Sequence, residues 1–572
     1  MHAFQSNRKS PGQNPARIIM LYHSIKDRFS IFGSYSRSIS VTIATSSALM
    51  LSALPITVSA DAIGPLSDVE RAQQAYQLRI DAATRNYNDP LPAHPDNGDE
   101  ALPGKINSYT KGLPHDDNGI VDRLAYRQMK RALSSGEPAD FEQITMGEGG
   151  FLLRNPQAAY TYFMEGKDPH SYTMPAAPTF DSAWQASDAI EVMWQALTRD
   201  VPFSDYSSSR LIRQAARDLS RMSDFRGPTE FNRVTPQTLF RGIGPGETEG
   251  PYISQFLLKP IPYGATTVTQ QYNVPVAGND HLTDYDEWLL IQRGGRPSGI
   301  TTVQFQEEPR YLYNGRALAQ YVLQDFVNQA YLGATRIIHG FGSGAYDTSD
   351  PYAGSISQAR SPLFGNNHAV DWLSRVSMGS QNVAWYQKWL VHRRARPEVF
   401  FGRIHNHKLN PAITYDIHRD ALRSRALDKV FEKYGTYLLP TATPNGSPLH
   451  PTYPAGHSVM AGAAVTMLKA FFNGDFVIPD PVMPNQDGTE LVPYTGGQLT
   501  IEGELNKLAS NISLGRDVAG VHYRTDGDLG MALGEDYAIS ILRELVDTYN
   551  EDFTGFSFNR FDGTPVTISK SQ

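Results

Sequence analysis

Apolar residues recur every three or four positions in several long segments of the chain. This spacing places them on one face of a helix, so it predicts amphipathic helices. Segment 457–472 is apolar on nearly all sides, which indicates a helix at the centre of the fold. The predicted helices span residues 67–85, 121–134, 183–197, 208–222, 316–338, 369–389, 457–472, 504–513 and 526–549.

Turn-forming residues separate these helices. Gly and Pro are frequent from 225 to 315, where a few short pieces have the composition of β-strands. No clear linker divides the helical part, so the pattern predicts an all-α fold class with long loops and minor β-structure. We expect an N-terminal helical and loop region at 61–180, one large helical domain at 181–555 and a C-terminal tail at 556–572.

The first sixty residues have the features of an export signal. Basic residues precede an apolar run from Ile39 to Val58, and small residues at its end suit cleavage near Ala60. Pro55 and the many Ser and Thr residues of the run argue against a permanent membrane span. The sequence therefore predicts a signal peptide at 1–60 and a mature protein that is secreted or periplasmic, with no membrane span.

Composition narrows the possible chemistry. The 572 residues carry a formal net charge of -8 and the pI is near 6.0, so there is no general basic field for nucleic acid and any anion site must be local. Cysteine is absent, which excludes disulfides, thiolate metal sites and a cysteine nucleophile. The absence suits a protein that meets oxidants, although compositional bias explains it equally well.

The most informative motif lies where the central helix is predicted to begin. Pro454-Ala455-Gly456-His457 is a turn that opens the apolar segment. The first backbone N–H groups of a helix lack internal partners and the helix dipole is positive there, so phosphate-like anions bind such ends. Gly456 lets the backbone approach a ligand closely. His457 supplies an imidazole that gives and takes protons near neutral pH.

Further cations and a second histidine accompany this motif. Arg516 offers a planar fork of donors that fits two oxygens of an oxyanion. His522 follows it closely and is suited to attack or ligate the central atom, while Asp526 is suited to hold the other ring nitrogen of His522. Lys388 and Arg396 precede the motif, and the proline after Arg396 favours an extended conformation there.

Each of these features alone is common in chains that have no such site. A Pro-x-Gly-His turn usually just starts a helix, and an arginine close to a histidine occurs by chance in most long chains. The joint order Lys…Arg-Pro…Pro-x-Gly-His…Arg-x5-His-x3-Asp is far rarer, and every member has a role in holding a tetrahedral oxyanion. The combination therefore predicts an oxyanion site.

This order resembles the acid phosphatase and vanadium haloperoxidase superfamily. The likeness to red-algal-type vanadium bromoperoxidases covers roughly residues 180–550, and the spacing from Lys388 to Arg396 matches their form and not that of the phosphatases. The resemblance implies a helical fold built around two four-helix bundles, with one vanadate per subunit at the end of one bundle. Other matching segments are Arg241-Gly242, 250–256, 261–264, 316–332, 391–394, 396–398 and 404–408.

The resemblance also implies roles for individual residues. Lys388, Arg396 and Arg516 would hold the vanadate oxygens. Gly456 would donate its backbone N–H to vanadate, and His522 would be the axial nitrogen ligand and so the metal-binding residue.

The implied reaction is the oxidation of halide by hydrogen peroxide to a hypohalous acid equivalent, which halogenates organic acceptors. His457 would take the peroxide proton, and Lys388 would polarise the oxygen that halide attacks. His450 resembles a histidine of the bromoperoxidases, whereas Trp385 looks like the chloroperoxidase pocket. We therefore expect bromide and iodide as substrates and leave chloride open.

Two alternatives stay open at this point. One is a secreted acid phosphatase of the same superfamily, with His522 as the phosphoryl-accepting nucleophile, because phosphate and vanadate share shape and charge. The other is a haloperoxidase-like protein that has lost activity or uses an unusual organic substrate. It rests on Ala455, which stands where the family usually has a serine that hydrogen-bonds vanadate.

Two further expectations concern partners of the chain. Asp347 and Asp350 lie in a loop at 340–367 that is a candidate for calcium, as in some algal relatives, although the carboxylates are few. Algal relatives also assemble into large symmetric particles, so the resemblance implies a homo-oligomer.

Overall fold

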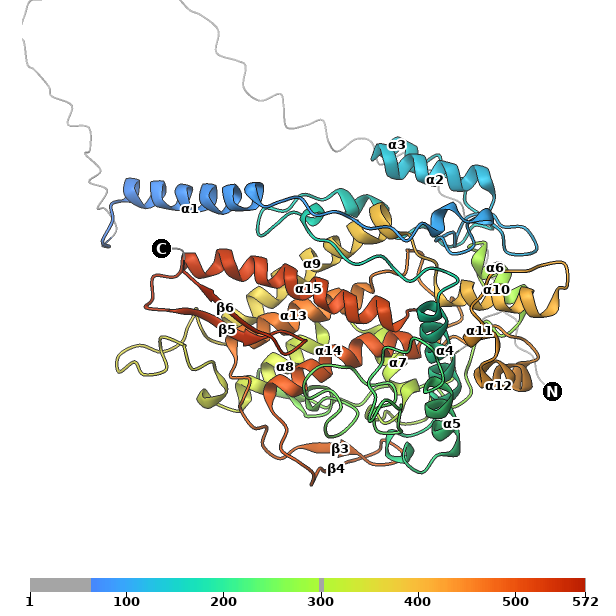
Figure 1. Cartoon of the computed structure of the whole chain (residues 1–572). Coiled ribbons are helices and arrows are strands. Elements are labelled where there is room, and N and C mark those ends of the chain that lie inside the picture. The colour runs from blue at the N-terminus through green and yellow to red at the C-terminus, as the bar shows by residue number, and fades with distance from the viewer. Residues whose placement is uncertain (1–62, 298–302, 571–572) are drawn as a thin grey trace, which may run out of the picture. The chain divides into compact units, whose positions relative to one another are not determined.

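The computed structural model of the protein describes residues 63–297 and 303–570 (Figure 1). The chain divides into two units, Met1–Val69 and Glu70–Gln572. The predicted signal peptide at 1–60 lies outside the described residues. Among the described residues, no helix combines the length and the apolar character that crossing a membrane requires.

Helices dominate the second unit, as the apolar spacing predicts. The longer helices are α1 (Asp68–Asn88), α2 (Arg123–Ser135), α4 (Ala183–Thr198), α5 (Arg210–Leu219), α7 (Gly315–Gln324), α8 (Gln329–Gly340), α9 (Asn366–Tyr386), α10 (Pro397–Leu409), α12 (Arg425–Tyr434), α13 (Gly456–Phe471), α14 (Ile501–Val518) and α15 (Arg524–Leu545). Shorter helices are α3 (Pro138–Phe141), α6 (Tyr285–Gln292) and α11 (Arg419–Leu422).

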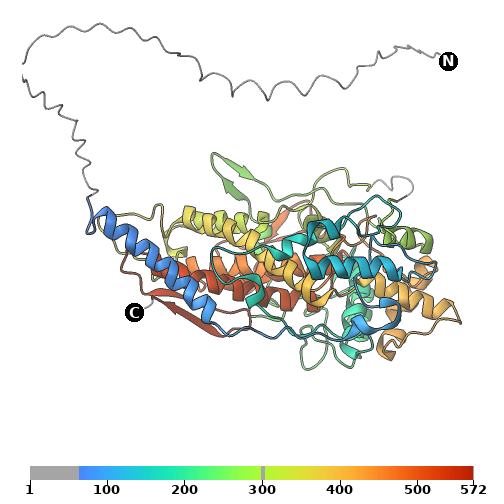
Figure 2. The ribbon, with the colours of Figure 1, turned by 90° about the horizontal axis from the view of Figure 1, so that it is seen from above.

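The central bundle consists of α13 and the helices α9, α14 and α15 that pack around it (Figures 1 and 2). Every residue of α13 from Ser458 to Phe471 is buried, which confirms the central position predicted from its composition. Glycines bring α13 and α15 unusually close. A Cβ on Gly462 would lie 2.0 Å from the Met531 carbonyl oxygen, and one on Gly534 would lie 1.9 Å from that of Val459.

A second group of helices gathers around α4, which contacts α5, α10, α11 and α12. The N-terminal part of the unit has a small hydrophobic core of its own, in which Tyr109 and Tyr126 are buried together with Trp389. Trp389 follows Lys388 directly in the sequence. The region predicted as 61–180 therefore packs on the segment that carries one of the candidate site residues.

The predicted helix 316–338 is wrong in one respect, because two helices occupy this segment. Helix α7 ends at Gln324 and α8 begins at Gln329. Asp325 leaves the helical conformation, with φ -61° and ψ 145°, and Phe326 in the break is 56% exposed. Apolar spacing continues through the break, so the pattern alone does not reveal it.

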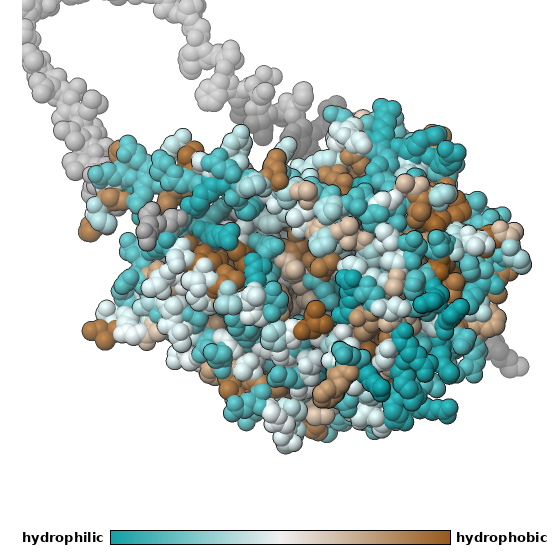
Figure 3. Space-filling view, in the orientation of Figure 1, coloured by the Kyte–Doolittle hydropathy of each residue, from teal (hydrophilic) through white to brown (hydrophobic). Residues whose placement is uncertain are grey.

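In the described residues the minor β-structure consists of three antiparallel hairpins, and β1 of the first hairpin packs on α8. The predicted C-terminal tail contains the longest hairpin, where buried Phe556 pairs with buried Ile568. On the face seen in Figure 3, hydrophobic side chains are scattered among hydrophilic ones. The strands are β1 (Ile261–Tyr263), β2 (Thr266–Val268), β3 (Val482–Pro484), β4 (Leu491–Pro493), β5 (Gly555–Asn559) and β6 (Pro565–Ser569).

Candidate functional site

The candidate site begins at the N-terminus of α13. Ala455 is the N-cap residue, and its carbonyl oxygen accepts from the backbone N–H groups of Ser458 and Val459 at 3.1 and 3.0 Å. Its methyl side chain caps nothing. Among the described hydrogen bonds, the N–H groups of Gly456 and His457 have no acceptor, which leaves two donors for a ligand at the positive end of the helix dipole.

Two backbone irregularities bring Lys388 and Arg396 into the site. Helix α9 continues as a π-helix, Gln387–His392, which carries Lys388 and ends at Arg393 in the left-handed region (φ 43°). Arg396 is the extended N-cap of α10, with φ -78° and ψ 158°, as the proline after it predicts. The chain thus leaves one helix and enters the next within a few residues.

Arg396 joins two histidines at the floor of the site. Its Nη1 lies 2.9 Å from His522 Nε2, and its Nη2 lies 3.0 Å from His450 Nδ1. Lys388 Nζ donates to the carbonyl oxygens of residues 451 and 452 at 2.6 and 2.9 Å. These contacts bring together the predicted residues Lys388, Arg396, His450 and His522. All four side chains are buried.

The tautomer of His522 follows from its neighbours. Asp526 Oδ2 lies 3.0 Å from His522 Nδ1, and Asp526 Oδ1 accepts from Arg394 at 3.0 Å. The Tyr523 backbone N–H also donates to Asp526. A guanidinium that donates to Nε2 and a carboxylate beside Nδ1 together require a neutral ring protonated at Nδ1. The lone pair of Nε2 therefore points toward the positively charged side chains of the site.

Several buried positive side chains lie close together in the site. Burial lowers the pKa of Arg396 to about 10. Burial also lowers the pKa of Lys388 well below its ordinary value, and the neighbouring charge of Arg396 lowers it further. The pKa of His522 is likewise lowered well below its ordinary value, first by burial and then by the charge of Arg396. An anion bound among these groups would attract each positive charge and would raise their pKa values again.

Arg516 completes the cationic cluster from the last turn of α14. Its Nη1 donates to the Val322 carbonyl oxygen at 2.6 Å, while its buried Nε has no hydrogen-bond partner among the described residues. Its charge is one of those that lower the pKa of His522. A buried guanidinium N–H without an acceptor costs free energy, because the group has lost its hydrogen bonds to water. An oxyanion bound here would supply the acceptor.

His457 lies at the second position of α13 and is the partly exposed member of the site. Its Nε2 is 3.0 Å from Oδ1 of Asp325, a buried carboxylate in the break between α7 and α8. The ring nitrogen Nδ1 is therefore the one left for proton transfer. The sequence analysis missed Asp325, and the available signal was an acidic residue inside an otherwise apolar stripe.

The two residues that gave opposing indications on halide choice lie side by side. The rings of Trp385 and His450 have centroids 4.8 Å apart and an interplanar angle of 37°. Burial lowers the pKa of His450 well below its ordinary value, and the charge of Arg396 contributes further. His450 is thus neutral in this environment and borders an aromatic wall.

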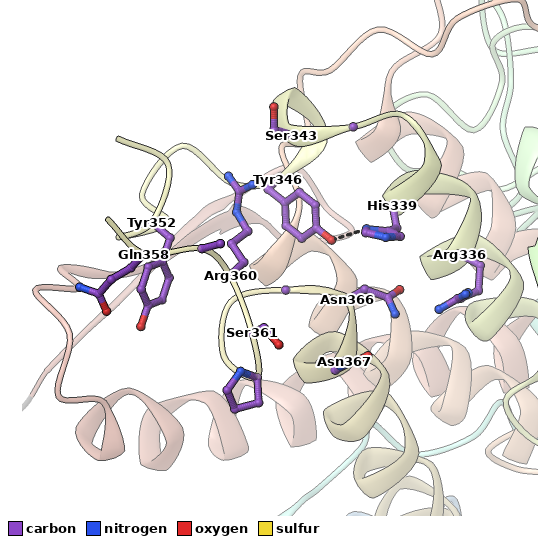
Figure 4. Close-up of a pocket in the computed structure, with 14 residues that line it drawn as sticks. Arg336, His339, Ser343, Tyr346, Tyr352, Gln358, Arg360, Ser361, Asn366 and Asn367 are labelled. Carbon is purple, nitrogen blue, oxygen red and sulfur yellow. Dashed lines mark hydrogen bonds between the residues drawn. The ribbon is translucent and has the colours of Figure 1, made fainter. Parts of the chain in front are cut away.

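A cavity of about 570 Å³ lies near the opposite end of α9 (Figure 4). It is lined by polar side chains that include Arg336, Arg360 and Asn366, and Tyr346 is 2.7 Å from His339 Nδ1. Helix α9 has 21 residues, so its two ends are about 30 Å apart. This cavity is therefore separate from the site built around Lys388.

Both carboxylates of the loop expected to bind calcium have internal partners. Arg360 donates to Asp350, and Asp347 accepts from Ser349. The described residues contain no group of three or more acidic, histidine or cysteine side chains arranged for a metal ion.

Comparison with known proteins gives concordant results. Residues 374–551 match the family model of the VCPO second helical-bundle domain. The vanadium-dependent bromoperoxidase of Ascophyllum nodosum is 34% identical over 535 residues, which cover 90% of this chain and 95% of that protein. That of Corallina pilulifera is 31% identical over 592 residues, covering 87% and 98%.

The chain belongs to the vanadium-dependent bromoperoxidase family. A solved structure of the second vanadate-dependent bromoperoxidase of Ascophyllum nodosum, a homohexamer, superposes with a TM-score of 0.85 at 29% identity and covers 92% of this chain and 95% of that one. The expected helical fold of the vanadium haloperoxidases is thereby confirmed. Family membership also confirms the resemblance derived from the order of Lys388, Arg396, Gly456, Arg516 and His522.

Proposed function

We propose that this protein is a vanadate-dependent haloperoxidase that oxidises bromide or iodide with hydrogen peroxide. The product is a hypohalous acid equivalent that halogenates organic acceptors. One observation carries the proposal: Arg396 Nη1 lies 2.9 Å from His522 Nε2, inside a buried cationic cluster. A neutral imidazole whose Nε2 lone pair faces a cluster of cations is suited to ligate the central atom of an oxyanion that replaces the Arg396 contact.

The residues present fit vanadate. Arg396, Arg516 and Lys388 would hold its oxygens, and His522 Nε2 would be the nitrogen ligand. The N–H groups at the start of α13 add neutral donors, among them that of Gly456. The orphaned Nε of Arg516 and the mutual lowering of pKa values in the cluster support a resident anion.

When bound, vanadate supplies a Lewis-acidic centre that activates peroxide without a change of oxidation state. The protein supplies proton transfer and charge. His457 takes the peroxide proton, and Asp325 holds its ring in one orientation. A bound anion would raise the pKa of Lys388 again, and the ammonium group would then polarise the oxygen that halide attacks. His450 lies on the wall shared with Trp385.

The experiment that tests the proposal measures bromination of a dye by the purified protein with peroxide and bromide, with and without vanadate. Hydrolysis of a phosphate ester is measured beside it. Bromination that requires vanadate and is suppressed by excess phosphate is the expected result. Ester hydrolysis inhibited by vanadate, without bromination, would establish the phosphatase alternative and make His522 a nucleophile.

Calcium in the loop of Asp347 and Asp350 stays a prediction. Because Arg360 already neutralises Asp350, calcium binding would have to displace this ion pair. Elemental analysis of the purified protein after dialysis without chelator tests it, with Asp347→Asn as the variant expected to lose the ion.

Two properties of the mature protein complete the proposal. The homohexameric structural relative supports a homo-oligomer, which native mass spectrometry tests. Export with cleavage near Ala60 is supported by the apolar run that precedes it, and N-terminal sequencing of the protein recovered from its source tests it.

A further inference from the structure

The polar cavity of about 570 Å³ near the start of α9 has no part in the proposed function. It lies where α8 ends and α9 begins, and the loop between the two helices supplies the rest of its lining (Figure 4). We call it the α8–α9 cavity. Its lining includes Arg336 and His339 of α8, Tyr346 and Tyr352 of the loop, and Asn366 of α9.

Arg336 brings to this cavity a positive charge that no carboxylate balances. Its Nε donates to the Pro262 carbonyl oxygen at 3.2 Å, which holds the guanidinium in place and leaves Nη1 and Nη2 available. Among the described residues Arg336 forms no salt bridge, whereas the other arginine of the lining, Arg360, is paired with Asp350. No aspartate or glutamate lines the cavity in the described part of the chain. The cavity therefore favours an anionic ligand.

The N-terminus of α9 borders the same cavity. Gly365 is its N-cap residue and offers no side chain to cap the helix. The backbone N–H of Asn367 has no acceptor among the described hydrogen bonds. Helix α9 has 21 residues, and its dipole places partial positive charge at this end. Because oxyanions bind at such helix ends, α9 adds to the attraction that Arg336 exerts.

A buried acceptor indicates that the ligand also carries hydroxyl groups. Asn366 Oδ1 is buried and has no hydrogen-bond partner among the described residues. Asn366 is the first residue of α9 and lies with Arg336 and His339 at one end of the cavity (Figure 4). An amide oxygen repels an oxyanion, so its partner must be a donor such as a hydroxyl.

The rest of the lining suits the same kind of ligand. Hydroxyl and amide side chains predominate, and the Tyr346 hydroxyl is held 2.7 Å from His339 Nδ1. Cavities of this volume hold small organic molecules, so a simple tetrahedral anion would leave most of the space to water. An anion attached to a polyol would occupy the space and supply donors to the amide and hydroxyl groups.

We propose that the α8–α9 cavity binds a polyhydroxylated compound that carries a sulfate or phosphate ester group. The ester oxyanion lies between Arg336 and the first turn of α9, and a hydroxyl of the ligand donates to Asn366 Oδ1. None of the residues of the candidate site takes part, so the inference is independent of the proposed function.

Isothermal titration calorimetry of the vanadate-loaded protein tests the inference with glucose 6-sulfate, glucose 6-phosphate, glucose and inorganic sulfate. We expect an ester to bind once per subunit, at least tenfold more tightly than glucose or inorganic sulfate. The ester that binds more tightly identifies the natural group. Failure of both esters to bind would overturn the inference. So would affinities no higher than that of glucose or of inorganic sulfate.

A second readout separates this cavity from the candidate site, because phosphate esters resemble vanadate in shape and charge. The vanadium content of the protein should stay constant during the titration. The His522→Ala protein should bind glucose 6-sulfate as the wild type does. Release of vanadium by the esters, or loss of their binding in His522→Ala, would place them in the candidate site and overturn the inference. Absence of bromination with ester binding retained would concern the proposed function alone.

Arg336→Gln should weaken binding of the ester at least about tenfold, because it removes the charge-assisted hydrogen bonds. Arg375→Gln is the matched control, since Arg375 is an arginine of α9 that pairs with Asp371 and does not line the cavity. Thermal unfolding of both variants checks that they fold. Equal affinities of the two variants for the ester would show that the inference is wrong.

Asn367→Asp provides a variant that does not endanger folding. Asn367 is exposed in the first turn of α9, where a carboxylate is favourable for the helix. The new negative charge should repel the ester oxyanion and lower its affinity at least tenfold, while the melting temperature stays at or above that of the wild type. Unchanged affinity in Asn367→Asp would place the oxyanion away from the N-terminus of α9 and overturn the inference.

Discussion

His457 Nε2 lies 3.0 Å from Asp325 Oδ1, although the two residues are 132 positions apart. The contact exists because the chain leaves the helical conformation at Asp325, between α7 and α8. The break turns a residue that would have been one more position on a helix into the partner of the acid–base histidine. A fixed imidazole exposes the same nitrogen to the substrate at every turnover.

Asp325→Asn tests this relationship. The amide has the size of the carboxylate but can donate as well as accept, so it no longer fixes the His457 ring in one orientation. We expect kcat for bromide oxidation to fall on the order of tenfold to a hundredfold, with vanadium content unchanged. Steady-state kinetics and elemental analysis measure the two quantities. Asp371→Asn, an exposed carboxylate on α9, is the control and should retain wild-type kcat.

His522→Ala should abolish tight vanadate binding, because it removes the nitrogen ligand and the acceptor of the Arg396 hydrogen bond. We expect the Kd for vanadate to rise by more than about 100-fold, measured by equilibrium dialysis. His339→Ala, near the opposite end of α9, should bind vanadate as the wild type does. Full halide oxidation by His522→Ala would show that the ligand assignment is wrong.

Ala455→Ser should restore a hydroxyl at the start of α13. The serine would donate to vanadate, so the Kd for vanadate should fall roughly tenfold. In the vanadate-free protein the same hydroxyl can cap the helix, which should raise the free energy of unfolding by about 0.5–2 kcal/mol. Ala455→Gly lacks the hydroxyl and should not tighten binding. Equal affinities of the serine and glycine variants would contradict the prediction.

Glu247 should make stability depend on pH. Burial raises the pKa of Glu247 from an ordinary value of 4.5 to about 8. Between these pH values the folded state holds the proton that the unfolded state has released, so stability falls as pH rises. The Glu247→Gln protein stays neutral at this position. Its free energy of unfolding should therefore fall less between these pH values, by on the order of a few kcal/mol.

Thermal unfolding at a series of pH values between 4.5 and 8 measures this dependence on Glu247. The neighbouring Glu249 is exposed, so Glu249→Gln is the matched control and should leave the slope unchanged. A Glu247→Gln protein with the wild-type slope would show that another group is responsible.

Local patterns predicted much of the fold. The apolar spacing located nine helical segments, and the structure has helices in all of them, because burial of one face leaves the same period wherever a helix meets a core. The extended conformation of Arg396 was also predictable, since the ring of the following proline excludes the helical alternative. The break at Asp325 was not, because apolar spacing continues through it and no Gly or Pro marks it.

The sequence by itself determined which groups are available: two histidines, three cations and a glycine-led helix start in a rare order, which suffice to indicate an oxyanion site. The tertiary structure decided how they meet. Arg396 contacts His450 and His522, which follow it by 54 and 126 residues, and the orphaned Nε of Arg516 and the Asp325 partner of His457 appear only after folding. Periodicity records whether a residue is buried, whereas close packing such as that of Gly462 and Gly534 sets which buried residues touch.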